Sequence, residues 1–477
     1  MAIKFVDIFS GPGGLNEGFA SLNDSKHEPV FQSTIAAEMD KDAVMTLRLR
    51  KFYRECLRTD DLDNYFDYVL GEKTLPYDSK NATLWKLISH LTPQVTLGDE
   101  THNEHFDKLL QNTISRDDHW VLLGGPPCQA YSKIGRWRYR TENGYDLSDD
   151  HRAHLYKEYL RVLSKFGPSV FVMENVTGLL SSPFFDKIIE DLMKIKVNGC
   201  SYLVYSLTVP LEKTKSARDY VVKSEDYGLP QARHRVILLG VRTDIKNIPA
   251  TLDKRSTRVA ASDVLGSLPK LRSGFSKDTN DDNSWLEYVQ KSGALMAKKY
   301  GFSDEKYELL KQSSNVYLSS RSNIDVVNFI TENPCKFLTN HVTRGHIKGD
   351  VQRYLFSALF CKIKGQSPKA KDFPVDLIPQ HKNWDSGHFK DRFRVIRSQY
   401  PAPTVTSHIS KDGHAYIHYD PTQARSLTVR EAARLQTFPD NYFFSGPRTA
   451  QYRQVGNAVP PYLAKQIAKI VADLLTL

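Results

Sequence analysis

The chain has 477 residues, of which 40% are hydrophobic and 25% are charged, a composition typical of globular proteins that can build a sizeable core. No apolar run approaches the roughly 18 residues needed to cross a bilayer, and Asp7 interrupts the stretch that a secretory signal peptide keeps apolar. These features exclude a membrane-spanning protein and argue against export.

Five scattered Cys residues without a C-x-x-C pair exclude a zinc ribbon and a disulfide framework, so we expect a reducing, cytoplasmic compartment. Lys and Arg number 65 against 55 Asp and Glu, a net charge of +10. Such an excess is common in proteins that bind polyanions, although many other basic enzymes share it.

The first half of the chain alternates buried strands with helices. Hydrophobic runs and turn residues predict strands at 4–9, 34–38, 121–124, 170–173 and 235–241, and helices at 15–22 and about 41–52. Residues 53–93 are polar and are predicted to be a partly helical insertion. The alternation implies right-handed βαβ units and a parallel sheet covered on both faces. Ligands bind beyond the carboxyl ends of the strands in such sheets, so the residues just after each strand are candidate site residues.

The composition changes to Lys, Ser, Asn and Tyr with weak periodicity from about residue 250 to 400. We interpret this region as a separate, smaller and basic domain. Strand-forming residues return at 416–418, and Pro460-Pro461 followed by an apolar-periodic run predicts a closing helix over 462–477, because proline fits the first turn of a helix. The polar run 102–105 is predicted to be the surface of a helix.

Polar groups follow the first two predicted strands. A glycine turn at 11–14 lets the backbone approach a ligand closely, although its spacing is not that of a dinucleotide-binding loop, and a simple tight turn explains it equally well. Glu38 ends the second strand, where an acid commonly binds the ribose of an adenosine-containing ligand. Together they suggest an adenosyl cofactor.

Three more polar sites lie next to later strands. Cys128 stands in a rigid G-G-P-P-C frame that a merely packing Cys would not need, and a positive field would make its thiol nucleophilic. Glu174 closes an apolar run and could equally cap the next helix. Arg233 and Arg235 lie on one face of a strand, where a solvated charged edge is the alternative.

Six blocks in one order carry a family resemblance: D-I-F-S-G-P-G-G (7–14), G-P-P-C-Q (125–129), E-N-V (174–176), Q-A-R-H-R (231–235), R-E-A-A-R-L-Q-T-F-P (430–439) and Q-V-G-N-A-V-P-P (454–461). Each block is weak alone, but the ordered set resembles the bacterial DNA (cytosine-5-)-methyltransferases that use S-adenosyl-L-methionine. The resemblance covers roughly 1–265 and 400–477. It implies an α/β fold, with a doubly wound Rossmann-like methyltransferase sheet and a smaller, inserted target-recognition domain.

The domains implied by this resemblance are a catalytic and cofactor-binding domain at 1–265, a target-recognition domain at 266–405, and a segment at 406–477 that returns to the catalytic domain. The variable region at 270–400 carries no block of the resemblance. In the family this region holds the residues that select the target sequence.

The resemblance also implies the catalytic roles. Cys128 would add to C6 of cytosine, Glu174 would contact N3 and the exocyclic amine, and Arg235 would hold O2. Arg233 would brace the loop. Because an intact duplex hides C6 in the stack, the cytosine must flip out, and Gln129 matches a position that reaches into the gap.

For the cofactor, Phe9 and Met39 would sandwich the adenine, with Met39 in place of the more usual aromatic residue. Glu38 would hold the ribose and Asp99 would read the adenine amino group. No metal is needed. The predicted cofactor-contacting residues are Phe9, Gly11, Gly13, Gly14, Glu38, Met39, Asp99, Pro126, Leu155 and Asn457.

Duplex DNA is the implied partner. The basic segment after the nucleophile matches a loop that closes over DNA and offers Ser132, Lys133, Arg136 and Arg138. The variable region offers Arg344, Arg392 and Arg394. Thr406 lies in a turn that resembles the one that positions the recognition domain against the flipped nucleotide in the family. Ordinary basic surface is an equal explanation for these residues.

Two other functions remain open. An RNA (tRNA) cytosine-5 methyltransferase has the same fold, but the long variable region favours duplex DNA. A catalytically silent DNA-binding regulator is disfavoured by the intact Cys128, Glu174 and Arg235. From the resemblance we expect a monomer associated with the bacterial nucleoid, acting in a restriction-modification system with a cognate restriction endonuclease.

Overall fold

The computed structural model describes residues 2–115, 119–127, 155–181, 184–303, 305–318, 322–332, 336–380, 384 and 392–476. The chain divides into two compact units. The first comprises Met1–Tyr227, Arg233–Ser256 and Ala458–Leu477, and the second comprises Gly228–Ala232 and Thr257–Asn457. The predicted target-recognition range lies within the second unit, and the division into three domains stays a prediction.

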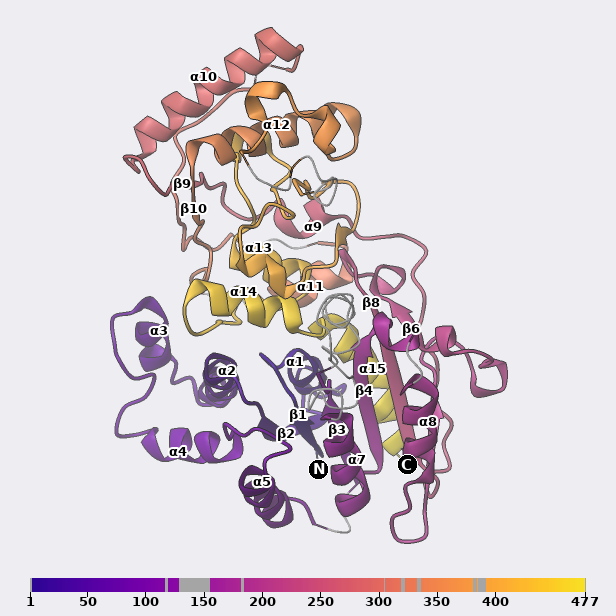
Figure 1. Cartoon of the computed structure of the whole chain (residues 1–477). Helices are drawn as coiled ribbons and strands as arrows, with labels where there is room; N and C mark the ends of the chain where they lie inside the picture. The colour runs from indigo at the N-terminus through magenta and orange to yellow at the C-terminus, as the bar shows by residue number, and fades with distance from the viewer. Residues whose placement is uncertain are drawn as a thin grey trace. The chain divides into compact units, whose positions relative to one another are not determined.

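A seven-stranded sheet forms the centre of the first unit (Figure 1). Its order is β2-β1-β3-β4-β8-β5, and β6 also pairs with β8. The strands are β1 (Ile3–Ile8), β2 (Phe31–Ala37), β3 (Trp120–Gly124), β4 (Val170–Val176), β5 (Tyr202–Tyr205), β6 (Val221–Lys223) and β8 (His234–Arg242). Each predicted strand is therefore present.

The sheet is mostly parallel, as predicted, but the predicted strand at 235–241 runs in the opposite direction. β1, β2, β3 and β4 pair in parallel, whereas β8 is antiparallel to β4, β5 and β6. The physical reason is the connection, because a parallel partner needs a crossover and β6 reaches β8 without an α-helix between them. The reversal places the start of β8 beside the carboxyl end of β4.

Helices cover both faces of this sheet. They are α1 (Gly14–Ala20), α2 (Lys41–Thr59), α3 (Asp63–Leu70), α4 (Ala82–Leu91), α5 (Glu100–Thr113), α7 (Leu155–Phe166), α8 (Phe184–Lys194) and α15 (Pro461–Leu475). Helices α5, α7 and α8 share one apolar core with the sheet. Figure 1 shows α7 and α8 in front of the strands and α15 behind them.

Close helix contact on the second face explains two glycines. A Cβ on Gly14 would lie 2.0 Å from the carbonyl oxygen of Val459, and a Cβ on Gly18 would lie 2.3 Å from the Cβ of Ala464. The predicted closing helix is confirmed as α15, with proline in its first turn. Helix α1 can therefore approach α15 only because its facing residues lack side chains.

The insertion after β2 is more helical than predicted. Helix α2 continues to Thr59 and ends where Asp60 takes a left-handed conformation (φ 54°), beyond the predicted end near residue 52. Cys56 faces the core along this extra length, which gives the helix a buried face to continue. Helices α3 and α4 follow, and the rings of Tyr77 and Trp85 stack at 5.5 Å.

The second unit contains helices and very short strands. These are β7 (Gln231–Ala232), α9 (Ala261–Leu265), β9 (Gly274–Phe275), α10 (Asp282–Tyr300), α11 (Asp325–Thr331), β10 (Gly345–His346), α12 (Lys348–Lys364), β11 (Ala402–Pro403), α13 (Val429–Leu435) and α14 (Arg448–Asn457). A single-turn helix, η9 (Ser407–Ser410), precedes residues 416–418, of which Ile417 bridges to Val395 and Ser426. An apolar core rich in aromatic residues lies around α10 and α12.

The sequence block at 430–439 is buried in this unit and has a structural role. The carboxylate of Asp440 pairs with Arg434 at 2.6 Å, and Glu431 pairs with Arg425 at 2.6 Å. The guanidinium of Arg430 donates to the carbonyls of Thr339, Pro439 and Tyr442. These motif residues therefore hold the second unit together.

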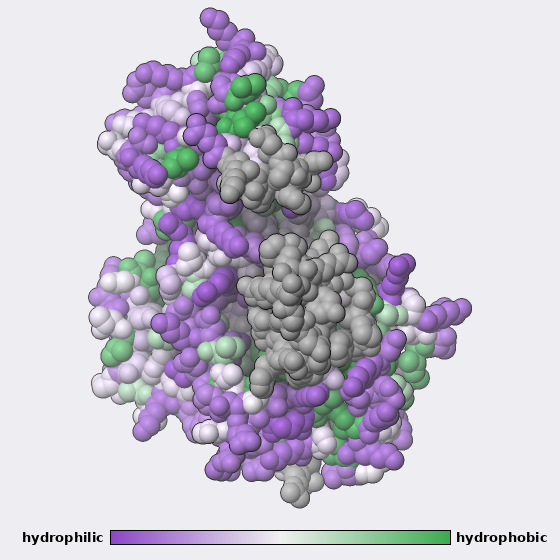
Figure 2. Space-filling view, in the orientation of Figure 1, coloured by the Kyte–Doolittle hydropathy of each residue, from purple (hydrophilic) through white to green (hydrophobic). Residues whose placement is uncertain are grey.

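The charge is divided unevenly between the units. The second unit contains 29 Lys and Arg against 19 Asp and Glu, whereas the first contains 36 of each. The whole net charge of +10 therefore lies in the second unit. Hydrophilic side chains dominate the described surface in Figure 2, and no helix among the described residues is long and apolar enough to span a membrane.

Candidate active site

The turn after β1 is built for a close approach of the backbone. Gly11 has φ 55° and Gly13, which caps α1, has φ 88°, both in the region that glycine adopts without strain. Phe9 is also left-handed (φ 54°). A Cβ on Gly11 would meet nothing within 4 Å among the described residues, which leave open space over this glycine.

Glu38 connects this turn to the end of β2. Its Oε2 accepts the N–H of Gly11 at 2.8 Å, and its Oε1 accepts the N–H groups of Met39 and Asp40 at 2.9 Å. Burial raises the pKa of Glu38, and these three hydrogen bonds oppose that rise. A carboxylate has about four acceptor positions, so one remains for a ligand hydroxyl.

The other predicted cofactor residues of the first unit lie on segments around Glu38. The side chain of Met39 is 58% exposed. Asp99 is exposed and caps α5 by accepting the N–H of His102 at 3.0 Å. Leu155 begins α7 and lies 3.6 Å from the Cβ position of Gly98. Asn457 is exposed at the end of α14 in the second unit.

Asp7 is a candidate residue that the sequence analysis quoted without assigning a role. It is 1% exposed at the end of β1, where Ser10 and Asn16 supply the polar groups around its carboxylate. Burial, and next the charge of Glu38, raise the pKa of Asp7 to about 7. An acid at the end of an otherwise apolar strand was the signal that could have identified it.

The predicted catalytic pair lies where β4 and β8 adjoin. The Nε of Arg235 is 2.8 Å from the Oε1 of Glu174, and the register pairs Val176 with Arg235. The alternative role of Glu174 as a helix cap is not what the structure shows. Its second oxygen, Oε2, lies 3.1 Å from the Cβ position of Gly125, so a glycine there leaves room for the carboxylate.

Asn175 fixes the loop that leads toward Cys128. Its Nδ2 donates to the carbonyl of Pro126 at 3.3 Å, and its Oδ1 accepts the N–H of Val176 at 2.8 Å. The E-N-V block therefore places Glu174 and also holds Pro126, which sequence reasoning missed. The predicted residues Cys128, Gln129, Ser132, Lys133, Arg136 and Arg138 lie outside the described residues.

Arg233 is 2% exposed, unlike a residue of a solvated edge. Its backbone N–H donates to the hydroxyl of Ser224 at 2.9 Å, and its carbonyl accepts the N–H of Ser224 at 3.1 Å. His234, the residue between the two arginines, pairs with Glu225 at 2.8 Å. Arg233 and Arg235 therefore begin β8 in a fixed register.

Arg344, which was predicted to face DNA, is buried in the second unit. Arg344 is 8% exposed, donates to the carbonyls of Ile409 and Lys411, and stacks on Tyr452 at 4.2 Å. Arg344 is thus a packing residue of the second unit, and its prediction as a DNA-facing side chain is corrected. Its apolar stacking partner and carbonyl acceptors are distant in sequence.

The remaining candidates of the second unit stay accessible. Arg394 is exposed, and Arg392 is partly exposed beside Asp412 at 3.1 Å. The hydroxyl of Thr406 is 2.9 Å from that of Tyr416. The preceding Thr404 donates to the carbonyl of Ala232 at 2.7 Å, so this turn packs beside the residues that precede Arg233 in the chain.

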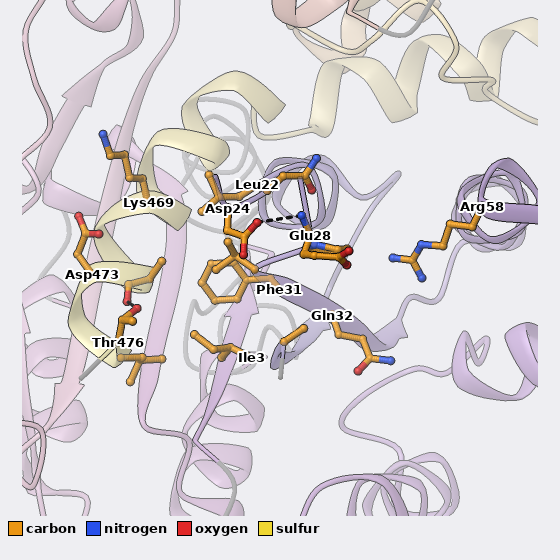
Figure 3. Close-up of a pocket in the computed structure, with 16 residues that line it drawn as sticks. Ile3, Leu22, Asp24, Glu28, Phe31, Gln32, Arg58, Lys469, Asp473 and Thr476 are labelled. Carbon is orange, nitrogen blue, oxygen red and sulfur yellow. Dashed lines mark hydrogen bonds between the residues drawn. The ribbon is translucent and has the colours of Figure 1, made fainter. Parts of the chain in front are cut away.

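A pocket of about 1080 Å³ lies near the amino ends of β1 and β2 (Figure 3). Ile3 and Phe31, which begin β1 and β2, line it together with Leu22, Asp24 and Lys469. Because the predicted site lies at the carboxyl ends of these strands, this pocket is separate from it. The described residues contain no group of three or more His, Cys, Asp or Glu placed to hold a metal ion.

Comparison with known proteins identifies the family. The family model for C-5 cytosine-specific DNA methylase matches residues 79–472. The chain belongs to this family. It is 32% identical to the type II methyltransferase M.Bpa9945I of Bacillus paralicheniformis over 98% of both chains.

Other relatives agree with this assignment. The methylase is 28% identical to the type II methyltransferase M.DdeI of Desulfomicrobium norvegicum, over 98% of this chain and 88% of the relative. Its fold is similar to that of a prophage-encoded E. coli protein described as a DNA modification methyltransferase, with a TM-score of 0.56, 21% identity and 99% coverage of both chains. The Rossmann-like fold and the DNA (cytosine-5-)-methyltransferase activity expected from the sequence are thereby confirmed.

Proposed function

We propose that this methylase acts on a cytosine flipped out of duplex DNA, with Cys128 as the nucleophile and Glu174 and Arg235 as the groups that bind the base. The ion pair of Glu174 and Arg235 at 2.8 Å carries this proposal. It joins two predicted residues 61 positions apart at the edge of the sheet where ligands bind in this fold.

Each residue has a separate chemical task. The thiolate of Cys128 adds to C6, which makes C5 electron-rich. Glu174 holds N3 and the exocyclic amine while charge develops on the ring, and Arg235 holds O2. Once C5 has taken the methyl group, loss of the C5 proton to a base and breakage of the bond from C6 to sulfur restore the aromatic ring. The Cys128 thiolate is thereby regenerated.

S-Adenosyl-L-methionine, when bound, supplies an electrophilic methyl group for C5. The turn after β1 suits it, because the open space over Gly11 admits a ligand and Glu38 retains an acceptor position for a ribose hydroxyl. The carboxylate of Asp7 is buried at the same end of β1, where a ligand that brings positive charge would offset the cost of burying it.

Phe9 and Met39 would sandwich the adenine, and Asp99 would read its amino group. Gly11 and Gly13 would approach the methionine end, with Gly14 and Pro126 as further candidates, and Leu155 would line the far side. Asn457 stays a proposed cofactor residue on the strength of the resemblance alone. Gly14 would act through its packing against the backbone of Val459, which sets where the turn lies.

Duplex DNA is the proposed substrate and the second unit its recognition module. The +10 charge of that unit supports this role, because phosphate contacts supply much of the affinity for DNA. Arg392, Arg394 and Thr406 are its proposed contacts. Ser132, Lys133, Arg136 and Arg138 would close over the DNA beside Gln129 and Cys128.

The proposed setting is restriction-modification, since the relatives are named type II methyltransferases. A cognate restriction endonuclease would then recognise the same sequence. We further propose that the enzyme is a monomer, because one site handles one flipped base, and that it acts in the cytoplasm on nucleoid DNA.

Incubation with tritiated S-adenosyl-L-methionine and unmethylated bacterial DNA, followed by bisulfite sequencing, tests the activity and finds the target. We expect protected cytosines within one short sequence, none with Cys128→Ala, and a covalent complex with a 5-fluorocytosine duplex. Labelling of tRNA without DNA would mean an RNA methyltransferase. Cofactor binding without labelling or trapping would mean a silent regulator.

A further inference from the structure

Residues 93–96 form an extended segment that lies against the end of β2, and residues 97–99 turn from it into α5. The N–H of Val95 donates to the carbonyl of Glu38 at 2.9 Å. The side-chain amide of Gln94 donates to the carbonyl of Met39 at 3.1 Å. Val95 and Leu97 are buried, whereas Gln94 and Thr96 are exposed. One face of the segment is therefore anchored in the core, and the other lies beside Met39.

Side chains in the first turn of α5 hold the far end of this segment. The N–H of Thr96 donates to Nδ1 of His102 at 3.3 Å, and the N–H of Gly98 donates to Oδ1 of Asn103 at 3.1 Å. Asp99 closes the same turn by capping α5. Gly98 has φ 100°, so the chain reverses there into the helix.

Asn103 is in turn held by helix α7. The Nδ2 of Asn103 donates to Oε2 of Glu158 on α7 at 3.0 Å, and Arg161 holds Glu158 at 2.8 Å. The side-chain oxygen of Asn103 therefore binds the segment, and its side-chain nitrogen binds α7. Helix α7 begins with Leu155, another proposed cofactor residue.

We propose that Gln94, His102 and Asn103 are positioning residues for the adenine half of the cofactor. They touch neither the methyl group nor the cytosine. They hold the backbone of Met39 and the loop before Asp99 in place, so the binding site is formed before the cofactor arrives. This inference rests on the proposed cofactor site.

If these residues preorganise the site, removing them should weaken the affinity for the cofactor and leave the rate of the chemical step unchanged. Without these side chains, the segment must be ordered at the moment of binding. A single lost hydrogen bond of this kind corresponds to about a fivefold weaker affinity.

The test measures binding of S-adenosylhomocysteine by calorimetry, together with KM for S-adenosyl-L-methionine and kcat. For Gln94→Ala, His102→Ala and Asn103→Ala we expect Kd and KM to rise about fivefold each, with kcat at saturation unchanged. His102→Asn keeps an acceptor near the position of Nδ1 and should restore wild-type affinity. Glu104→Ala and His105→Ala, exposed on the same helix, are the matched controls and should change neither constant.

Glu38→Ala separates the possible failures. If Glu38→Ala weakens binding while the Gln94, His102 and Asn103 variants stay within twofold of wild type, this inference is overturned and the proposed site stands. The same holds if His102→Asn binds as weakly as His102→Ala, because the hydrogen bond is then not the cause. If Glu38→Ala leaves binding unchanged, the proposed cofactor site itself is wrong.

Discussion

Acidification should destabilise the second unit, because this unit buries neutral histidines. Burial lowers the pKa of His341 and His418 to about 4 and that of His346 to about 3. The contacts of His341 accommodate the neutral ring: Nε2 lies 3.0 Å from the carbonyl of Pro269, to which it can donate, and Nδ1 lies 3.0 Å from the hydroxyl of Thr428, from which it can accept.

The sign and size follow from proton linkage. An unfolded histidine takes up a proton as the pH falls through about 6.5, whereas these folded histidines do so only near pH 4 or below. Stability is therefore complete above pH 6.5 and is lost as the pH falls below it. Between pH 8 and pH 5 each histidine costs about 2 kcal/mol, so the three together cost roughly 6 kcal/mol.

The first unit should respond in the opposite direction. Burial raises the pKa of Asp7 to about 7, well above the usual range of an aspartate. The folded state therefore takes up a proton before the unfolded state does, and stability increases as the pH falls from 8 to 5. This contribution is about 3 kcal/mol.

Pulsed hydrogen exchange in urea at pH 8 and pH 5, corrected for intrinsic exchange, reports on peptides of each unit separately. We expect the urea midpoint of α12 and α13 peptides to fall at pH 5. His346→Gln should remove about one third of the pH-dependent loss whatever it does at pH 8, and His105→Gln in the first unit is its control. A second unit as stable at pH 5 as at pH 8 would refute the reasoning.

Three further substitutions test local geometry. Gly125→Ala places a Cβ 3.1 Å from Oε2 of Glu174, so we expect a lower kcat with an unchanged Kd for S-adenosylhomocysteine, and an unchanged kcat would mean that Glu174 is free to move. Glu17→Gln removes the buried partner that lies 2.6 Å from Arg50 and 2.9 Å from Arg54; urea unfolding should show a loss of about 3–5 kcal/mol, and a loss below about 1 kcal/mol would contradict it. Gly18→Val would collide with Ala464 on α15, so we expect a loss of about 3 kcal/mol or more and a lower Tm, and an unchanged Tm would show that the two helices can separate.

Local pattern predicted much of the fold and the site. The strands, the glycine turn and the closing helix follow from hydrophobic runs, glycines and prolines that act within a few residues. Glu174 and Arg235 were found because each adjoins a buried strand, and parallel strands bring their carboxyl ends to one edge. The reversal of β8, which places Arg235 at that edge, needed the connection as well as the pattern.

Long-range contacts decided the rest. Gly14 is fixed by Val459, which lies near the other end of the sequence, and Arg344 is buried because Tyr452 and two carbonyls converge on it. His102 and Asn103 have the composition of an exposed helical turn, yet they hold the backbone before Asp99. Sequence by itself determined which residues end strands and begin helices, because those choices depend on neighbours in the chain. Only the tertiary structure decided whether a polar side chain meets solvent, a ligand or a distant backbone group, because that depends on which segments folding brings together.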